Sequence, residues 1–462
     1  MSFQPVILWT DALVYLLLVL LALTVWHTRR HAHLLLPWRR VADSRVGQAT
    51  MVVLAFYVLI GLLDTLHFHP QTDSDDKGEP VYSTEILSLF DVLAGPLRTQ
   101  REKTYSAPFA LHLFSKETIR DADGVSIRAY PRLLYGGVHL AEDGSGKWAD
   151  IAGKAARGAF EGMLAWVVLM LLLNRLSLGR VLTVLRGESA RPSHVGAWTL
   201  FAVVVCFAAL WELSGHYHIL GTDKVGEDVF YQSLKSIRTG LLIGTLTTLV
   251  MLPAALLLGI MAGYFRGWVD DVIQYLYTTL NSIPGVLLIA AAVLMMQIYM
   301  SNHADEFNSL TERADLRLLF LCLILGVTSW TSLCRLLRGE ALKLRELEYV
   351  QAARAFGVGH FTILLRHILP NVMHIVLITI VLDFSGLVLA EAVLSYISIG
   401  VDPATSSWGN MINGARLELA REPIVWWSLL AAFGFMFTLV LAANLFSDVV
   451  RDAFDPRLRE QR

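Results

Sequence analysis

The chain has 462 residues, of which 55% are hydrophobic and only 17% are charged, and its formal net charge is −2. This composition is unusual for a soluble protein, and it gives no indication of nucleic-acid binding because no basic tail is present. Several apolar runs are about 20 residues long, the length that crosses a bilayer as a helix. The 3 cysteines lie in or beside these runs, which favours small core residues over a disulfide or metal framework.

Nine apolar segments are predicted to cross the membrane as helices. To within a few residues they cover 6–26, 49–66, 158–174, 195–213, 238–263, 272–299, 316–334, 371–397 and 424–446. The first lacks a basic start and a small-residue cleavage site, so we expect a retained span rather than a signal peptide. Glycines and prolines inside the spans, such as Gly259 and Pro284, predict close packing or kinks. The sequence therefore predicts an all-α polytopic membrane protein.

The distribution of Lys and Arg predicts which side of the membrane each loop faces. Basic residues are concentrated in loops 27–48, 175–194 and 335–370 and in the C-terminal tail. With nine spans these segments all fall on one side, which the positive-inside tendency makes cytoplasmic. Segment 67–157 is also rich in basic residues, but loops longer than about 60 residues cross largely regardless of charge. We therefore expect the N-terminus outside and the C-terminus in the cytoplasm.

The most informative segment is 348–371, which is basic and helix-prone and lies between two apolar runs. Ala352 and Ala353 present small side chains that would let a partner approach the backbone closely. Gly357 is a typical helix terminator, and a helical pattern then resumes until Pro370, where we expect it to break. Two helices joined by a glycine corner are suited to docking into a groove of another protein. An ordinary amphipathic loop is the alternative.

This segment resembles the cytoplasmic coupling loop of the permease subunits of binding-protein-dependent ABC importers. The family pattern is Glu-Ala-Ala, three residues, Gly, nine residues and Ile-x-Leu-Pro. In this chain Gln351 replaces the Glu and His367 replaces the Ile. The ending Arg-His-Ile-Leu-Pro-Asn is similar to the dipeptide, oligopeptide and nickel branch. The resemblance implies that the ATPase-coupling residues are Glu348, Gln351, Ala352, Ala353, Gly357, Leu369 and Pro370.

Three further segments resemble the same family. Residues 220–230 are similar to its external Leu-Gly-Thr-Asp segment. Residues 389–400, followed by 407–409, are similar to the end of its fifth core span, and 451–457 to its terminal signature. Glu227 stands where the first segment usually has Arg, which leaves its pairing open. Ser398 stands where the second segment usually has Gly.

The resemblance divides the chain into two predicted parts. Residues 195–462 contain six predicted spans and the cytoplasmic coupling loop 335–370, and they would form a type I ABC importer permease core. Residues 1–194 form an N-terminal extension with three spans and a large external loop, 67–157, that carry no recognised motif. That loop is either a small ordered domain or lid, or a poorly ordered insertion. A receptor role for it would add to transport rather than replace it.

The implied function is that of a transport subunit rather than an enzyme, in the bacterial cytoplasmic (inner) membrane. The sequence has no phosphate-binding loop, so ATP would be hydrolysed on another subunit. The implied partners are a second homologous permease, two cytoplasmic ATPase subunits, an extracytoplasmic solute-binding protein and the lipid bilayer, with no cofactor and no nucleic acid. The implied solutes are short peptides or peptide-like compounds, with nickel complexes as an alternative. Basic residues that would complement an acidic groove on the ATPase, or merely mark the cytoplasmic face, are Arg338, Lys343, Arg345 and Arg354.

Two acidic residues lie inside predicted spans. An ionised group at the middle of a membrane costs about 2.5–3.5 kcal/mol on insertion scales, so it usually faces protein or a water-filled path. Asp383 lies near the middle of its span, and Glu391 lies about two turns further out. Both are candidates for the translocation path, where they would meet a peptide amino group or a cation. The alternative is a helix-packing hydrogen bond, which we favour for Glu391, while both interpretations stay open for Asp383.

Three His-x-His pairs border the spans, at 31/33, 67/69 and 216/218. Two imidazoles at this spacing can chelate a transition metal on an extended backbone, but histidine also suits a membrane interface by its polarity. A membrane-embedded metalloenzyme, with Glu227 or Asp228 beside the external histidines, is therefore the rival hypothesis. The sequence has no His-Glu-x-x-His motif or other dense ligand cluster, which counts against it, so no metal-binding residue is assigned.

Overall fold

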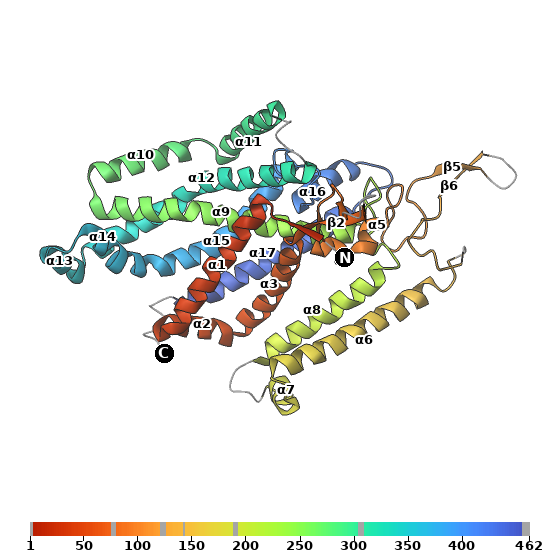
Figure 1. The fold of residues 1–462 in the computed structure, drawn as a ribbon, viewed down its shortest axis with the longest axis horizontal. Coiled ribbons are helices and arrows are strands. Elements are labelled where there is room, and N and C mark those ends of the chain that lie inside the picture. Colours follow the sequence, from red (N-terminus) through yellow and green to blue (C-terminus); the bar gives the residue numbers. More distant parts are fainter. Residues whose placement is uncertain are drawn as a thin grey trace. The chain divides into compact units, whose positions relative to one another are not determined.

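The computed structural model describes residues 3–74, 80–120, 126–141, 144–187, 193–303 and 309–454. Within these ranges, 9 helices are long and apolar enough to cross a membrane (Figure 1). They are α1 (Trp9–Arg30), α3 (Arg45–Asp64), α6 (Lys147–Leu173), α8 (Ser193–Ser214), α9 (Val229–Phe265), α11 (Gly285–Asn302), α12 (Leu310–Arg345), α15 (Leu369–Tyr396) and α17 (Trp427–Phe454). The predicted all-α polytopic membrane fold is confirmed.

Shorter elements join these helices. The helices among them are α2 (Ala32–Asp43), α4 (Leu89–Leu93), α5 (Gly95–Thr99), α7 (Leu178–Leu185), α10 (Trp268–Ser282), α13 (Glu348–Ala355), α14 (His360–Ile363), the π-helical turn η2 (Leu364–Ile368) and α16 (Trp408–Glu418). Strand β1 (Phe3–Val6) pairs antiparallel with β2 (His67–Ser74), with Phe3 opposite Pro70. Strands β3 (Pro80–Tyr82) and β4 (Leu87–Ser88) also pair with β2, while β5 (Glu117–Arg120) and β6 (Ser126–Ala129) form a separate hairpin.

The predicted span 272–299 is wrong as a single helix. Helix α10 ends at Ser282 and α11 begins at Gly285, with Ile283 in an extended conformation (φ −91°, ψ 130°) between them. Pro284 causes the break, because proline lacks a backbone N–H and pushes the preceding residue out of the helical region. The proline therefore ends one helix and starts another instead of kinking a continuous span.

The contacts divide the chain into two compact units. Unit 1 comprises Met1–Ile7, Arg39–Thr239 and Ser406–Leu445, and unit 2 comprises Leu8–Trp38, Gly240–Thr405 and Phe446–Arg462. Each unit draws residues from both sides of residue 194. The boundary at 194 was drawn from family motifs rather than from contacts, and it stays a prediction.

Unit 2 is built on close contact between α9 and α12. A Cβ at Gly259 would lie 2.7 Å from the Cys334 carbonyl oxygen, and one at Gly263 would lie 2.6 Å from that of Arg338. The close packing predicted for Gly259 is therefore confirmed, since only glycine permits this approach. Helix α1 joins the same unit through its first turn, where the backbone N–H of Thr10 donates to Asp315 Oδ2 at 3.1 Å. A carboxylate at a helix N-terminus accepts a hydrogen bond from an otherwise unpaired N–H and interacts favourably with the positive end of the helix dipole.

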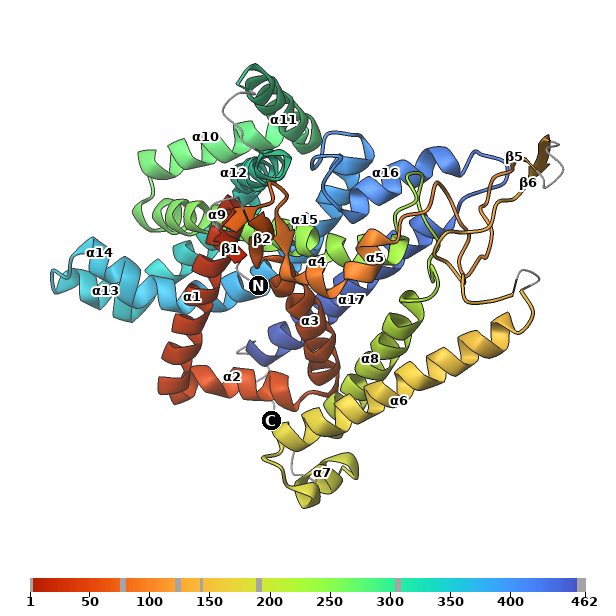
Figure 2. The ribbon, with the colours of Figure 1, turned by 45° about the vertical axis from the view of Figure 1, so that its right-hand side comes forward.

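Unit 1 contains the helix pair α6–α8, whose members run side by side in Figures 1 and 2. Gly158 and Gly162 stand four residues apart on α6 and face α8. A Cβ at Gly158 would lie 2.7 Å from the Ala208 carbonyl oxygen, and one at Gly162 would lie 2.9 Å from the Val205 Cα. This small-xxx-small arrangement lets two membrane helices approach through their backbones.

The segment between α3 and α6, which we call the polar domain (65–146), packs on residues 216–228 within unit 1. The Ser106 N–H donates to the Thr222 hydroxyl at 2.7 Å, and the Thr222 N–H donates to the Ser106 carbonyl oxygen at 3.1 Å. The Glu102 N–H donates to the Gly226 carbonyl oxygen at 2.9 Å. Gly226 has φ +76°, and a Cβ there would lie 1.8 Å from the Glu102 carbonyl oxygen. Of the two alternatives for loop 67–157, its described residues therefore favour an ordered domain.

Candidate functional site

The predicted glycine corner is present at the end of α13. The Gly357 N–H donates to the Arg354 carbonyl oxygen at 3.0 Å, and the Val358 N–H donates to that of Ala353 at 3.1 Å. With Gly357 at φ +76°, these bonds form a Schellman motif, which satisfies the last carbonyl groups of a helix. The corner therefore needs the left-handed conformation that glycine adopts without strain.

The predicted helix break at Pro370 is wrong. The chain stays helical from His360 to Tyr396, through α14, η2 and α15. Pro370 lies in the first turn of α15, directly after the π-helical turn, where the wider i→i+5 backbone precedes the proline ring. Proline inside a helix removes a hydrogen bond and clashes with a carbonyl group of the preceding turn, and the wider π-helical turn relieves that clash.

The predicted coupling residues differ in their exposure. Ala353 and Leu369 are half-buried against a core cluster that includes Val350, Ile363 and Ile368, and these three are at most 2% exposed. The exposed members are Glu348, Gln351, Ala352, Gly357 and Pro370. Ala353 and Leu369 therefore help to seat the segment on its own unit, while the exposed members remain accessible to a partner.

Two phenylalanines were missed by the sequence analysis. Phe356 is 88% exposed and Phe361 is 72% exposed, one on each side of Gly357. Large exposed apolar side chains beside a sharp corner are typical of an interaction site. Their signal was present in the sequence, as two aromatic residues flanking a glycine in a segment predicted to lie in water.

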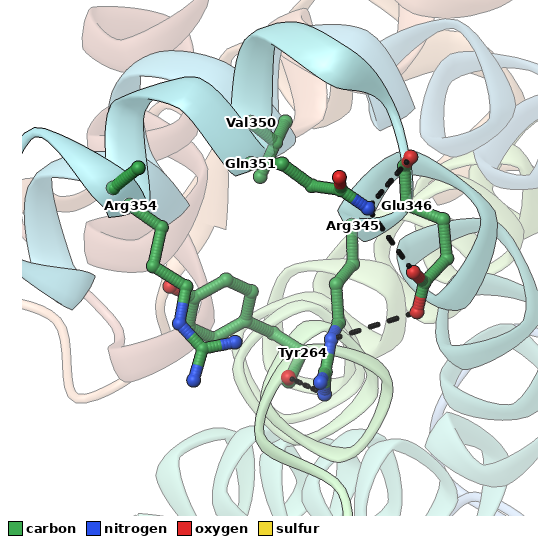
Figure 3. A pocket seen from close by; sticks show the side chains of 7 residues that line it. Tyr264, Arg345, Glu346, Val350, Gln351 and Arg354 are labelled. Atoms are coloured by element: carbon green, nitrogen blue, oxygen red, sulfur yellow. Dashed lines mark hydrogen bonds and ion pairs between the residues drawn. The ribbon is translucent and has the colours of Figure 1, made fainter.

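A pocket of about 340 Å³ lies beneath α13 (Figure 3). Its lining consists of Tyr264, Arg345, Glu346, Val350, Gln351, Arg354 and Ala355. The Arg345 guanidinium donates to the Tyr264 carbonyl oxygen at 2.7 Å. The Gln351 amide donates to the Glu346 carbonyl oxygen at 3.2 Å and to its carboxylate at 3.4 Å. A glutamate at position 351 has no proton to donate at neutral pH, so the departure from the family pattern has a local role here.

The four basic residues predicted to meet an acidic groove are not equivalent. Arg338 holds Asp270 with two hydrogen bonds, of 2.6 Å and 2.8 Å, and this guanidinium lowers the pKa of Asp270 below its usual value. Lys343 pairs with Glu340 at 3.1 Å, and Arg345 is held at the end of α9 as described above. The Arg354 side chain forms no hydrogen bond or ion pair with any residue in the described ranges.

The two acidic candidates for the translocation path both lie on α15. Glu391 is buried and accepts a 2.7 Å hydrogen bond from the Ser395 hydroxyl, one turn along the same helix. Asp383 is half-buried, and its carboxylate has no hydrogen-bond partner among the described residues. The nearby Ser385 hydroxyl donates to the Leu382 carbonyl oxygen instead. A role for either residue in translocation stays a prediction.

His218, from one of the His-x-His pairs, is buried between two carboxylates of unit 1. Its Nδ1 lies 2.7 Å from Asp228 Oδ2, and its Nε2 lies 3.4 Å from Glu102 Oε1. The contact with Glu102 is an ion pair and not a well-formed hydrogen bond. Glu102 also accepts backbone N–H bonds from Leu134 and Tyr135, both at 2.8 Å. In the described part of the chain, no group of three or more His, Cys, Asp or Glu residues could hold a metal ion.

This cluster ties the polar domain to the start of α9 in a pH-dependent way. Burial disfavours the charged imidazole, but the interactions with the Asp228 and Glu102 carboxylates outweigh burial and raise the pKa of His218 to about 9. The ordinary pKa of histidine is about 6.5. A raised folded-state pKa means that the stabilisation is fully present below about pH 6.5 and is lost as the pH rises through about 9.

Two further departures from the family pattern, at 227 and 398, also have structural explanations. Glu227 pairs with Arg101 of the polar domain, with 2.6 Å between Nη2 and Oε1. Ser398 adopts φ +63°, which explains why glycine is usual at that position.

Comparison with known proteins identifies the family that this chain resembles. Residues 255–460 match the model of the family described as "Binding-protein-dependent transport system inner membrane component". The glutathione transport system permease protein GsiD of Pectobacterium atrosepticum is 33% identical over 244 residues, which is 52% of this chain and 73% of the relative. The oligopeptide transport system permease protein OppC of Mycobacterium tuberculosis is 31% identical over 256 residues, or 55% and 81%. A putative peptide permease protein of Brucella suis is 32% identical over 242 residues, or 52% and 73%.

Together with the candidate membrane spans of the described residues, these matches define a multi-pass membrane transport subunit rather than an enzyme. The chain belongs to the family of binding-protein-dependent transport system inner membrane components, the permease subunits of ABC importers. The resemblance predicted from residues 348–371 is confirmed, and membership of this family implies ATPase and binding-protein partners.

Proposed function

We propose that this permease moves short peptides or peptide-like solutes into the cytoplasm. The observation that carries the proposal is that relatives 31–33% identical to this chain are named glutathione, oligopeptide and peptide permeases. Import of a nickel complex is the runner-up, because the resemblance includes the nickel branch. Family membership does not favour the metalloenzyme hypothesis.

The proposed assembly contains a second homologous permease, two cytoplasmic ATPase subunits and an extracytoplasmic solute-binding protein. In it the N-terminus lies outside and the C-terminus lies in the cytoplasm, as the distribution of basic loops supports. Residues 195–462 would form the permease core, and 1–194 would form an extension whose polar domain faces the outside.

The contacts around α13 support its role in coupling. Val350 of α13, Leu344 of α12, Tyr264 of α9 and Ile368 of η2 belong to one buried cluster. The Tyr264 hydroxyl also lies 2.8 Å from His360 Nδ1, at the start of α14. Packed interiors transmit displacement rather than absorb it. A pull on α13 by the ATPase would therefore move the cytoplasmic ends of α9, α12 and α15 together.

The test is uptake of radiolabelled di- and tripeptides into proteoliposomes that contain the assembled transporter, the binding protein and internal ATP. ATP-dependent accumulation, competed by unlabelled peptides and not by free Ni²⁺, is the expected result. Accumulation of a nickel complex with no peptide uptake would support the runner-up instead. No ATP-dependent uptake of either solute would contradict the proposed function.

A further inference from the structure

The pocket beneath α13 carries a positive charge that the described part of the chain leaves without a counter-ion. Its charged lining residues are Arg345, Glu346 and Arg354. Glu346 is already held by Arg266 at 2.9 Å and by the Gln351 amide. Arg345 is fixed by its 2.7 Å hydrogen bond to the Tyr264 carbonyl oxygen. The guanidinium of Arg354 is therefore the group that is left to bind a ligand (Figure 3).

We propose that this pocket receives a carboxylate side chain from the ATPase subunit and that Arg354 binds it. The proposal rests on the proposed function, in which the ATPase docks on α13. A guanidinium forms a charge-assisted and bidentate pair with a carboxylate, so this partner fits both the charge and the planar geometry. The volume of about 340 Å³ has room for such a side chain and several waters, each with a share of about 30 Å³ in the liquid.

Gln351 keeps the pocket open to an acidic partner. The family pattern places a Glu at this position, and here a glutamate would bring a second carboxylate next to that of Glu346, which lies 3.4 Å from the Gln351 amide nitrogen. That added charge would offset Arg354 from within the chain. The neutral amide donates to Glu346 instead and leaves the charge of Arg354 for the partner. The substitution at 351 therefore suits an ATPase subunit with an acidic residue at the contact.

The surroundings would strengthen such a pair on docking. Ala355 lines the pocket, and the next residue, Phe356, is 88% exposed. When a partner covers Phe356, water leaves the rim of the pocket and the local dielectric falls. The attraction between the two charges becomes stronger as the local dielectric falls.

The experiment measures the affinity of the full-length permease, assembled with its partner permease in nanodiscs, for the purified ATPase subunit that supports wild-type uptake. Arg354→Gln is expected to weaken binding about 10-fold, and Arg354→Glu more, while Arg354→Lys keeps most of the affinity because it keeps the charge. Gln351→Glu is expected to weaken binding as well. Arg366→Gln removes an exposed arginine of the same segment that does not line the pocket, and it should change affinity less than about 2-fold.

Salt gives a second measure. Raising the ionic strength from about 50 mM to about 300 mM should weaken wild-type binding more than Arg354→Gln binding, because screening acts on the pair that the variant lacks. Wild-type affinity in Arg354→Glu overturns the pocket proposal. If Gly357→Val then still abolishes binding, the coupling function stands. If neither change affects binding or uptake, both proposals fail.

Discussion

Gly357 offers the sharpest test of the predicted coupling loop (335–370), because a side chain added there changes the backbone conformation without meeting a neighbouring atom. Its φ is +76°, and a Cβ built there meets no atom within 4 Å. Replacing it with Val therefore adds conformational strain and no steric clash. Gly359 provides a matched control two residues away, since it has an ordinary φ of −61° and equally open surroundings.

The expected penalty follows from the left-handed conformation. A residue with a β-carbon pays on the order of 1–3 kcal/mol there, with a β-branched side chain at the upper end. A penalty of about 2 kcal/mol lowers the population of the native corner roughly 30-fold relative to conformations in which residue 357 has a negative φ. Apparent affinity falls with the fraction of the binding-competent state. Asn tolerates this conformation, so Gly357→Asn should have a much smaller effect than Gly357→Val.

The assay is co-purification of the ATPase subunits with tagged permease, measured beside solute uptake in the same cells. Gly357→Val should insert and assemble with the partner permease but lose the ATPase or hydrolyse ATP without uptake. Ala353→Glu should behave similarly, because added volume at a half-buried site costs about 1–3 kcal/mol. Gly359→Val should resemble the wild type. Wild-type ATPase binding and uptake in Gly357→Val would refute the assignment of residues 335–370 as the coupling loop.

Three other predictions concern the rest of the chain. His218→Gln should leave two buried carboxylates without a cation and so increase hydrogen exchange in 102–137. The wild-type protein should show the same increase as the pH rises through about 9. Unchanged exchange in both experiments would count against the cluster. If Asp383 only packs helices, Asp383→Asn should keep uptake and Asp383→Leu should lose it, while equal loss in both would indicate a charge in the path. Residues 195–462 expressed alone should insert with the same topology, which cysteine accessibility at both faces would report. The Tm should be lower, because the hydrogen bond from Glu102 to Gly226 is missing. An inverted or uninserted core would contradict the two-part division.

The spanning helices were predictable because membrane insertion depends on a local property. About 20 apolar residues suffice to specify a span, whatever their neighbours are. The corner at Gly357 was predictable for a similar reason, because a helix end and its glycine lie within a few residues of each other. The burial of individual side chains was not predictable, since Ala352 and Ala353 look alike in the sequence while the first is exposed and the second is half-buried.

Both errors concerned proline. Within 272–299, Pro284 was expected to kink a span, but the helix breaks at Ile283. At Pro370 the sequence predicted a break, but the helix continues after a π-helical turn. The effect of a proline depends on whether the surrounding backbone can move its carbonyl groups aside. That depends on packing, which the local sequence does not specify.

The sequence by itself determined the class of the protein, most of its candidate spans and the helix–glycine corner at Gly357. Only the tertiary structure showed that Arg338 is paired and that Arg354 has no ion pair in the described ranges, because Asp270, the partner of Arg338, lies 68 residues away in the chain. The same holds for the polar domain, where Ser106 and Thr222 are 116 residues apart. Hydropathy and helix signals act within one continuous stretch of at most about 20 residues. A charge, in contrast, is neutralised or left free by whichever residue folding brings within about 4 Å.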